Sequence, residues 1–464
     1  MSAEAVIEAM RPRFGERVAT TEAVRAHHAG GEGYKEHGLP DAVFFAQSNE
    51  DVAAVVSACA DHRVPVIPFG TGTSLEGHLQ ASAGAVSLDL SQMDRVLEVN
   101  AADLDCRVEA GVTREALNHE VKSAGLFFPL DPGANASLGG MAATRASGTN
   151  AVRYGTMREV TLGLTVVTPS GEIVRTGGRA RKSSAGYDLT RLYVGSEGTL
   201  GVITEVQLRL FGIPEQIAAA VCAFDTLEGA VEAVTTVLQL GVPVARIELL
   251  DALQMRACIA YSKLEGFAEA PTLFIEFHGS PASVADQVEQ VRACTEGCGG
   301  GKLRWATAQE ERTALWNARH NAYWAARGLK PGWDAFATDA CVPIAALPAA
   351  IAEASTAARE ADLVTPITGH VGDGNFHMMV LYDPADATMR ARASSLSDRV
   401  AHIALAHGGT ISGEHGIGLH KLSLMRHEHC GGALGVMRAV KNALDPMNIM
   451  NPGKTVPGLE EALA

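Results

Sequence analysis

The chain has 464 residues, 47% of them hydrophobic and 20% charged, which indicates a globular protein of two or three domains. Its formal net charge of -15 argues against nucleic acid or an anionic membrane surface as a general partner. No apolar run is long enough to span a bilayer, and the acidic residues 1–10 predict an ordinary helix start instead of a secretory signal. Eight scattered cysteines favour reduced thiols. We therefore expect a cytoplasmic protein, with peripheral attachment to the inner membrane left open.

The first motif in chain order is a strand followed by a glycine-rich loop. Residues 49–60 predict a helix and residues 64–68 a short buried strand, which runs into Phe69-Gly70-Thr71-Gly72-Thr73-Ser74. Small side chains and many free N–H groups suit such a loop to a pyrophosphate. The glycine spacing does not match the Rossmann fingerprint, and a plain glycine turn is the alternative interpretation.

A second glycine-rich stretch, residues 128–150, is almost devoid of large side chains. Such a run is either disordered or packed tightly against a flat partner, and the apolar strands around it argue against disorder. Strands are predicted at residues 162–168, 173–176 and 200–210, and Gly195-Ser196-Glu197-Gly198 stands at the entrance of the last one.

The pattern changes after about residue 213. Strand, helix and strand are predicted at residues 218–224, 226–240 and 245–250, and again at residues 272–277, 280–293 and 303–306. This duplicated unit is typical of a ferredoxin-like domain. A helix predicted at residues 309–328 carries Arg319, which by sequence alone is either a surface charge or a ligand-binding group.

Two histidines flank a predicted hairpin. Asp373-Gly374 predicts a two-residue type I′ turn between strands at residues 363–368 and 378–382, and this turn would pair His370 with His377. Cross-strand partners have Cβ atoms roughly 5 Å apart, so both imidazoles could reach one metal ion. Two half-exposed strand histidines without a metal are the alternative interpretation.

A third ligand is available in the glycine-rich stretch Ser412-Gly413-Glu414-His415-Gly416. Two histidines and Glu414 with an open position form the ligand set of a catalytic divalent site, for which zinc fits best, with manganese and iron left open. Adjacent residues of an extended chain seldom point to one centre. His415 is therefore predicted as a general base, and a fourth metal ligand is the alternative.

Several of these motifs, in this order, resemble one family. Residues 67–74, residues 131–155, residues 194–201 and the closing Asn451-Pro452-Gly453-Lys454 are similar to FAD-binding dehydrogenases of the vanillyl-alcohol oxidase / p-cresol methylhydroxylase superfamily. Residues 370–377 and 413–416 resemble its D-2-hydroxy-acid branch, which includes cytochrome-type D-lactate dehydrogenase, the glycolate oxidase flavin subunit and D-2-hydroxyglutarate dehydrogenase. The resemblance covers nearly the whole chain.

The resemblance implies noncovalent FAD, because Thr73 stands near the place where some relatives carry the histidine that attaches the flavin. It also implies that the first glycine loop holds the pyrophosphate, that the second stretch lies along the flavin and ribityl chain, and that residues 197–203 complete the bed. His78 is expected to act more as a packing residue. The predicted cofactor-binding residues are Pro68, Gly70, Thr71, Gly72, Thr73, Ser74, Gly77, His78, Pro132, Gly133, Ser137, Gly140, Ala143, Ser147, Gly148, Tyr154, Gly155, Glu197, Gly198, Val202, Ile203 and Asn451.

By the same resemblance, Arg319 matches the arginine that clamps the substrate carboxylate. Ala337 stands where D-2-hydroxyglutarate dehydrogenases carry a lysine for the distal carboxylate, so D-lactate, oxidised to pyruvate, is the predicted substrate. Hydride would pass to flavin N5 while a metal ion assists loss of the hydroxyl proton to His415. D-2-hydroxyglutarate and glycolate are alternatives within the family. A metal-dependent hydrolase and a non-catalytic flavin-binding subunit are alternatives of other classes.

The predicted fold is α+β, with three parts. A two-subdomain FAD-binding domain of the p-cresol methylhydroxylase type is expected at residues 1–212, and a ferredoxin-like cap domain carrying the metal site at residues 213–425. A C-terminal helical segment, residues 426–464, would pack back on the FAD domain. The expected partners are a small 2-hydroxy acid and an electron acceptor other than NAD or O2, namely a quinone, a cytochrome or an electron-transfer flavoprotein. No integral membrane segment is expected, and a homodimer is left open.

Overall fold

The computed structural model describes residues 3–31 and 38–458. Residues 1–2 of the predicted N-terminal helix and residues 459–464 of the predicted C-terminal segment lie outside the described residues. The chain forms two compact units. Unit 1 comprises Met1–Gly148, Gly155–Ile213 and Glu414–Ala464, and unit 2 comprises Thr149–Tyr154 and Pro214–Gly413. Among the described helices, none combines the length and the apolar character needed to cross a membrane.

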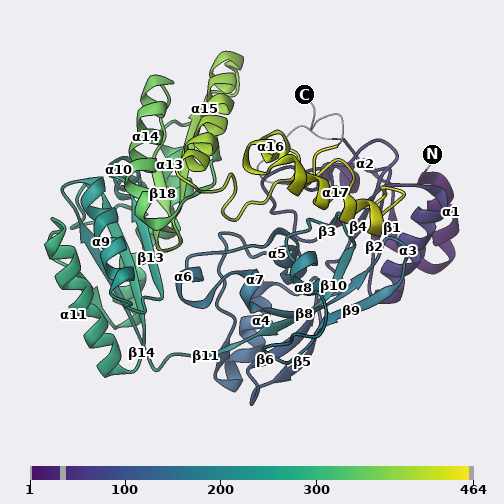
Figure 1. Ribbon diagram of the computed structural model, residues 1–464, viewed down its shortest axis with the longest axis horizontal. Coiled ribbons are helices and arrows are strands. Elements are labelled where there is room, and N and C mark those ends of the chain that lie inside the picture. The colour runs from purple at the N-terminus through teal and green to yellow at the C-terminus, as the bar shows by residue number, and fades with distance from the viewer. Residues whose placement is uncertain (1–2, 32–37, 459–464) are drawn as a thin grey trace. The chain divides into compact units, whose positions relative to one another are not determined.

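The strands of unit 1 are β1 (Val18–Ala19), β2 (Ala42–Phe45), β3 (Val66–Phe69), β4 (Val86–Asp89), β5 (Val96–Asn100), β6 (Asp105–Glu109), β7 (Leu126–Phe127), β8 (Thr161–Val167), β9 (Ile173–Gly177), β10 (Val202–Arg209) and β11 (Phe211–Gly212). They form a sheet in the order β1-β2-β4-β3, an antiparallel sheet in the order β5-β6-β10-β8-β9, and the ribbon β11-β7 (Figure 1). In the first sheet β2 and β3 both run parallel to β4. Unit 1 therefore has the two subdomains that the sequence predicts.

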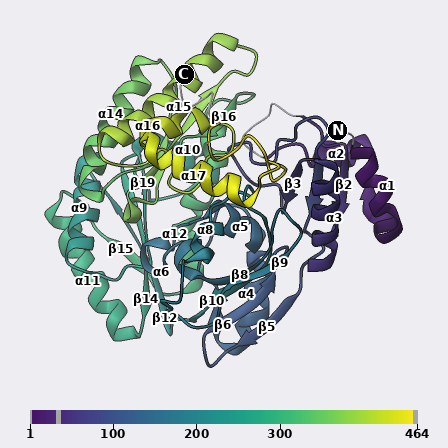
Figure 2. The same ribbon diagram turned by 45° about the vertical axis from the view of Figure 1, so that its right-hand side comes forward.

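The helices of unit 1 are α1 (Ala3–Phe14), α2 (Glu22–His27), α3 (Asn49–His62), α4 (Arg114–Val121), α5 (Leu138–Thr144), α7 (Met157–Val160), α8 (Leu189–Tyr193), α16 (Met425–Glu428) and α17 (Gly431–Leu444), with short 3-10 turns η1 (Gly15–Arg17), η2 (Lys122–Ala124) and η5 (Leu422–Leu424). The α3 helix begins where Ser48 accepts a hydrogen bond from Asp51 N, and α1 packs against it (Figure 2). The C-terminal segment reaches β3, because Val66 N donates to Ile449 O at 2.8 Å.

Unit 2 contains one large sheet, whose strand pairs are antiparallel. Its strands are β12 (Gln216–Ala223), β13 (Arg246–Leu250), β14 (Thr272–Gly279), β15 (Arg304–Ala306), β16 (Asp334–Ala337), β17 (Ala340–Cys341), β18 (Ile367–Gly369) and β19 (Asn375–Tyr382). The order is β15-β12-β14-β13-β18-β19-β16, with β17 also paired to β19. The first four strands, together with α9 (Leu227–Gln239) and α11 (Pro281–Gly297), are the two predicted βαβ repeats interleaved in one sheet. The ferredoxin-like prediction is confirmed.

The remaining helices of unit 2 are α6 (Ala151–Tyr154), α10 (Ala252–Ser262), α12 (Gln309–His320), α13 (Ala322–Gly328), α14 (Leu347–Glu360) and α15 (Ala387–Ala406), with the 3-10 turns η3 (Ile344–Ala346) and η4 (Val371–Asp373). Helices α9 and α11 lie side by side against the sheet (Figure 1). The single helix expected at residues 309–328 is instead two helices that break at Asn321. The side chain of Asn321 donates to Asn317 O at 3.2 Å and to Ser262 Oγ at 3.1 Å, which offers the backbone an alternative to a continuous helix.

The compact units differ from the predicted domain borders at two places. The chain re-enters unit 1 at Glu414 and not at residue 426, because Ile417 N and Gly418 N already donate to the carboxylate of Glu197. The segment Thr149–Tyr154 belongs to unit 2, where the Tyr154 hydroxyl lies 2.6 Å from His278 Nδ1. Thr149–Tyr154, a short part of the predicted flavin-binding stretch, thus contacts strand β14 of unit 2.

Candidate active site

The first glycine loop follows β3 in unit 1 and lies against the second glycine-rich stretch. A Cβ atom at Gly70 would lie 2.4 Å from Ser137 Oγ, so a larger residue at position 70 would displace the Ser137 hydroxyl. Ser137 N also lies within hydrogen-bonding distance of Thr71 Oγ1, at 3.4 Å. Gly72 has a φ of +76°, in the left-handed region that favours glycine. Two stretches predicted to bind FAD are therefore adjacent, although 66 residues separate Thr71 from Ser137.

The third stretch and the closing motif meet the same loop. A Cβ atom at Gly198 would lie 3.0 Å from Pro68 Cγ at the end of β3. Asn451 Nδ2 donates to His78 O at 3.1 Å and to Glu197 O at 2.7 Å. Asn451 therefore ties the C-terminal motif to both the first and the third predicted cofactor stretches.

The other predicted cofactor positions lie on the following elements. Thr73, Ser74 and Gly77 continue the first loop, and Pro132, Gly133, Gly140, Ala143, Ser147 and Gly148 lie before, within and after α5, which Ser137 precedes. Val202 and Ile203 are buried at the start of β10. Gly155, with a φ of +79°, stays in unit 1, whereas Tyr154 lies in unit 2.

Three buried serine hydroxyls of this region make no hydrogen bond to any residue that the structure describes. They belong to Ser74, Ser137 and Ser196, one in each predicted cofactor stretch. A buried hydroxyl group without a partner costs free energy, so such groups indicate the place of a polar ligand. Together with the small side chains around Gly70, they fit a cofactor that carries phosphate groups.

Glu197, one of the predicted cofactor-binding residues, also makes several contacts within unit 1. Its buried carboxylate accepts hydrogen bonds from Ile417 N at 2.7 Å and Gly418 N at 2.8 Å, and His78 Nε2 lies 3.2 Å away. Burial raises the pKa of Glu197, but His78 and the donors around the carboxylate outweigh this effect and hold the pKa below its usual value. The buried His78 thus packs beside the Glu197 carboxylate.

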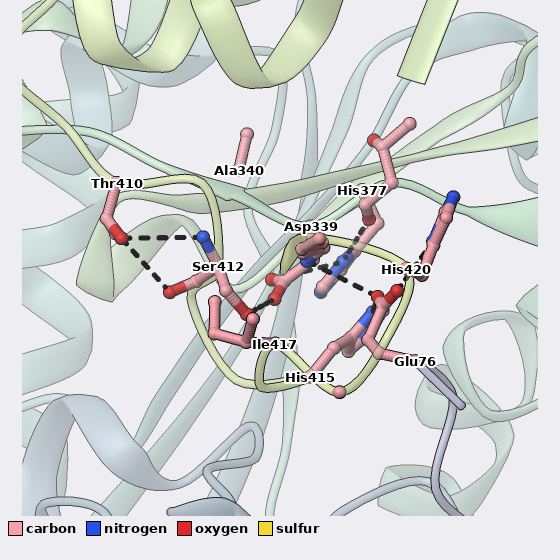
Figure 3. Close-up of polar contacts among 12 residues, drawn as sticks. Glu76, Asp339, Ala340, His377, Thr410, Ser412, His415, Ile417 and His420 are labelled. Atoms are coloured by element: carbon pink, nitrogen blue, oxygen red, sulfur yellow. Dashed lines mark hydrogen bonds and ion pairs between the residues drawn. The ribbon is translucent and has the colours of Figure 1, made fainter. Parts of the chain in front are cut away.

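His415, the predicted base, lies in unit 1 beside a second buried glutamate. His415 Nδ1 lies 3.3 Å from Glu76 Oε1, and His420 Nδ1 lies 2.7 Å from Glu76 Oε2 (Figure 3). Lys421 Nζ lies 3.3 Å from Oε1 of the same carboxylate. Burial raises the pKa of Glu76, but Lys421, His415 and His420 outweigh it and hold the pKa well below its usual value. Glu76 is therefore an anion in contact with the predicted base.

In unit 2 the predicted hairpin forms with a different register. Thr368, and not His370, is the partner of His377, because the 3-10 turn η4 and Gly374, with a φ of +79°, replace the two-residue turn. Asn375 N donates to His370 O at 3.3 Å, which closes the longer connection. The pairing of His370 with His377 across a type I′ turn is thus wrong. The two imidazoles are neighbours nevertheless, with ring centroids 5.4 Å apart.

Each of these two imidazoles has its Nδ1 atom engaged within unit 2. His370 Nδ1 donates to Glu248 Oε1 at 2.7 Å, and His377 Nδ1 donates to Thr338 O at 2.8 Å. Histidines that bind metals commonly donate their other ring N–H to a carboxylate or a backbone carbonyl. Nε2 is then the ring nitrogen through which each histidine would bind a metal, which fits the predicted role.

Glu248 also holds the predicted substrate arginine. Arg319 Nε donates to Glu248 Oε2 at 2.7 Å, and the Glu248 side chain is fully buried between Arg319 and His370. Burial raises the pKa of Glu248, but His370 and Arg319 outweigh this and keep the pKa below its usual value. Glu248 thus contacts both a predicted metal ligand, His370, and the arginine predicted to bind the substrate carboxylate. Because Arg319 is paired with this buried anion, it is not an ordinary surface charge.

The last predicted ligand, Glu414, follows a tightly held turn. Asp339 accepts hydrogen bonds from Asn375 Nδ2 at 2.8 Å and from Ser412 Oγ at 2.8 Å (Figure 3). A Cβ atom at Gly413 would lie 2.1 Å from Asn375 Nδ2, so this glycine packs directly on the start of β19. Glu414 is the next residue along the chain.

Three carboxylates of this region, Glu76, Glu248 and Asp339, were not singled out from the sequence. Each is a charged residue within a run of small or apolar neighbours, Leu75-Glu76-Gly77, Ile247-Glu248-Leu249 and Thr338-Asp339-Ala340. A carboxylate among small or apolar residues is costly to bury unless it is paired. Such a position in the sequence could therefore have identified these three residues.

Comparison with known proteins identifies the family. A family model described as FAD binding domain matches residues 40–177, and one described as FAD linked oxidases, C-terminal domain, matches residues 213–455. The fold is also that of p-cresol methylhydroxylase, with a TM-score of 0.82 over 98% of this chain and 97% of that chain, at 17% identity. A 4-ethylphenol oxidase from Gulosibacter chungangensis superposes with a TM-score of 0.80, covering 99% of this chain and 98% of that chain, at 19% identity.

Curated relatives agree with these matches. The chain is 48% identical to a probable mitochondrial D-lactate dehydrogenase of Danio rerio, over 98% of this chain and 92% of the relative. It is 43% identical to the mitochondrial D-lactate dehydrogenase [cytochrome] of Arabidopsis thaliana, over 91% and 75%. The glycolate oxidase subunit GlcD of Bacillus subtilis is 32% identical, over 90% and 89%.

The fold and the site define an FAD-linked oxidoreductase of the p-cresol methylhydroxylase type. The chain belongs to the family of FAD-linked oxidases that includes the D-lactate dehydrogenases and the glycolate oxidase flavin subunits, as its motifs predict. The predictions of an enzyme, of FAD and of an α+β fold are confirmed. The prediction of a cytoplasmic protein is wrong, because the D-lactate dehydrogenases of Danio rerio, Arabidopsis thaliana and two yeasts are all named as mitochondrial.

Proposed function

We propose that this chain oxidises a D-2-hydroxy acid to the corresponding 2-oxo acid, with D-lactate as the preferred substrate and pyruvate as the product. The observation that carries the proposal is the shared anion Glu248, which aligns Arg319 with His370. A 2-hydroxy acid presents a carboxylate next to a hydroxyl group. A cationic clamp beside a metal ligand suits those two groups. The relatives named D-lactate dehydrogenase support the choice of substrate.

Arg319 is proposed to bind the substrate carboxylate. Its Nε donates to Glu248, which restrains the guanidinium plane, and the two terminal nitrogens would then serve as a pair of donors for a carboxylate. Ala337 lies half-buried on β16, where it offers no charge to a second carboxylate. We therefore place monocarboxylates such as D-lactate ahead of D-2-hydroxyglutarate.

His370, His377 and Glu414 are proposed to hold a divalent metal ion, preferably zinc. The engaged Nδ1 atoms of both histidines support this assignment, as does the peptide link from Gly413, which packs on Asn375, to Glu414. A divalent ion bound there would supply Lewis-acid stabilisation of negative charge on the substrate oxygen.

His415 is proposed to accept the hydroxyl proton, which leaves the substrate ready to release the hydride from its α-carbon. FAD supplies the acceptor for that hydride when it is bound. The buried unpartnered hydroxyls of Ser74, Ser137 and Ser196 support its place in unit 1. The electrons are then proposed to pass to an acceptor other than NAD or O2, namely a quinone, a cytochrome or an electron-transfer flavoprotein.

The proposal is tested by steady-state turnover of the yellow, FAD-loaded enzyme with an artificial electron acceptor. D-lactate, L-lactate, glycolate and D-2-hydroxyglutarate are compared in parallel. We expect the highest kcat/KM for D-lactate, and a higher KM for D-lactate in Arg319→Lys, because an ammonium group cannot reproduce a planar two-point contact. A preference for D-2-hydroxyglutarate would show that another cation serves the distal carboxylate. Colourless protein without turnover would instead favour a hydrolase.

A further inference from the structure

Glu76 is a buried carboxylate of unit 1 that the proposed mechanism does not use, and three basic side chains contact it. It follows the first glycine loop, and its side chain is 4% exposed. Both carboxylate oxygens are engaged by basic groups from the segment that carries His415: His415 and Lys421 at Oε1, and His420 at Oε2 (Figure 3). The chain separation between Glu76 and His415 is 339 residues, so this contact exists only in the folded protein.

The backbone of Glu76 docks on the same segment. Leu419 N donates to Glu76 O at 2.8 Å, and His420 N lies 3.2 Å from that oxygen. A Cβ atom at Gly418 would lie 2.0 Å from Glu76 O, so the approach requires glycine at that position, where φ is +52°. The side chain of Glu76 therefore has a fixed position relative to His415.

We propose that Glu76 is a positioning residue for the base: it accepts a hydrogen bond from His415 Nδ1–H and so holds the imidazole in the tautomer whose lone pair lies on Nε2. This inference rests on the proposed function, in which His415 removes the substrate proton. The substrate O–H bond then breaks as its proton moves to Nε2, the α-carbon releases its hydride to FAD, and the C=O bond forms. The imidazolium that results is stabilised by the Glu76 anion, in the way a buried carboxylate orients histidine in other enzymes.

The first glycine loop and the residues that follow it would then have two roles, binding the FAD pyrophosphate and orienting the base. Residues 70–74 are proposed to bind the FAD pyrophosphate, and Glu76 lies directly beyond them in the same loop. The chain that holds the cofactor thus also orients the base. Glu197, from the third predicted cofactor stretch, accepts hydrogen bonds from the main chain of the same segment at Ile417 and Gly418.

The test compares Glu76→Gln with His420→Gln. Glu76→Gln keeps the size of the side chain, yet its amide N–H₂ can donate to Nδ1 and select the wrong tautomer. His420→Gln removes the 2.7 Å partner of Oε2 and leaves the His415 contact in place, so it is the matched control. FAD content, metal content, thermal unfolding and the rate of flavin reduction by D-lactate are measured for both variants.

For Glu76→Gln we expect bound FAD and metal to be retained, KM to stay within about threefold, and kcat and flavin reduction to fall by roughly 10- to 100-fold. His420→Gln should reduce its flavin within about twofold of the wild-type rate. Equal losses in both variants, or loss of FAD from Glu76→Gln with an unchanged rate per bound flavin, would overturn the proposal and leave Glu76 a structural residue.

A second readout does not depend on turnover. In ¹⁵N-histidine NMR spectra, with the His415 signals assigned from His415→Gln, the wild-type ring should carry its proton on Nδ1, and Glu76→Gln should shift population to the Nε2–H tautomer. A wild-type His415 protonated on Nε2 would overturn the positioning role. If no D-2-hydroxy acid reduces the flavin of the wild-type enzyme, the proposed function fails, while the NMR result still decides whether Glu76 orients His415.

Discussion

At the scale of single residues, buried carboxylates organise the candidate active site. Glu76, Glu197 and Glu248 are each almost fully buried, and each has at least one histidine as a partner. Burying an isolated carboxylate is expensive, so the surrounding donors must offset the desolvation for the anion to persist. Their pKa values all lie below the usual range, because these donors outweigh burial. Each glutamate can therefore fix the orientation of a histidine at neutral pH.

Local sequence pattern could identify the histidines and Arg319 but not these anions. His370, His377 and His415 stand in short glycine-rich motifs, which can be recognised from adjacent residues of the sequence. Glu248 acquires its role from His370, which is 122 residues away, and Glu76 from His415, which is 339 residues away. Such partnerships depend on the tertiary fold, and a single sequence contains no direct record of them.

The metal and base roles can be separated by substitution. His370→Ala or His377→Ala should remove the ion while FAD stays bound, because neither histidine is among the predicted cofactor-binding residues and both lie in unit 2. His415→Ala should keep both ion and FAD but slow flavin reduction by roughly 100- to 10,000-fold, as expected for loss of a general base. Metal analysis, flavin absorbance and stopped-flow reduction check this, with the exposed His62→Ala as the control. Loss of the ion from His415→Ala alone would show that His415 is a ligand.

At the scale of elements, the hydrophobic periodicity predicts the strands and helices of the cap, whereas the turn residues predict the wrong strand register. The strands and helices of the cap repeat clearly in the sequence, and β12 to β15 with α9 and α11 follow that pattern closely. Asp373-Gly374 predicts a two-residue turn, but Gly374 packs against Val342, which directly follows β17, and a Cβ at Gly374 would lie 2.0 Å from Val342 O. This tertiary contact favours the longer η4 connection, so the predicted register was wrong although the two imidazoles remained neighbours.

The glycine loop after β3 offers a test of the cofactor bed. Gly72→Val places a β-branched residue at a φ of +76°, with its Cβ 3.1 Å from Phe69 Cζ, so the loop should be displaced and the protein should be purified with little FAD. Gly186→Val is the matched control. It introduces the same strain at a φ of +82° in an exposed loop outside the predicted bed, where nothing lies within 4 Å of the added Cβ. Flavin absorbance per protein is measured for both, and full FAD in Gly72→Val would contradict the assignment.

At the scale of the whole molecule, unit 1 is assembled from segments that are distant in sequence. Its cofactor stretches come from three places before residue 204, and the closing motif at Asn451 joins the first of them to the third. The sequence resemblance indicated that the C-terminus returns to the FAD domain, but the point of return, Glu414, is set by contacts of Glu197 that have no sequence signature. The structural integrity of unit 1 should therefore depend on residues at its extreme C-terminal end.

The contribution of Lys454 to the stability of unit 1 can be measured from the pH dependence of unfolding. Lys454 is 4% exposed, and its side-chain nitrogen donates to Gln80 O at 2.6 Å, which links the closing motif to the segment after the first glycine loop. Burial lowers the pKa of Lys454 to about 7, an effect that nearby Glu197 opposes only in part. In the unfolded chain a lysine has a pKa of about 10.4. Between about pH 7 and pH 10 the unfolded chain therefore binds more protons than the folded one, so this residue makes stability rise with pH across that window and contributes no pH dependence below it.

Lys454→Met should remove this contribution. The calorimetric Tm of unit 1, measured from about pH 6 to pH 10, should rise less steeply with pH in Lys454→Met than in the wild type, because the methionine has no proton to release on folding. Other titrating groups are common to both proteins, so the difference between the two curves isolates Lys454. The exposed Lys182→Met should give a curve parallel to that of the wild type. If the Lys454→Met curve is also parallel, the lysine is charged in the folded protein, and its hydrogen bond to Gln80 O must then offset the cost of its burial.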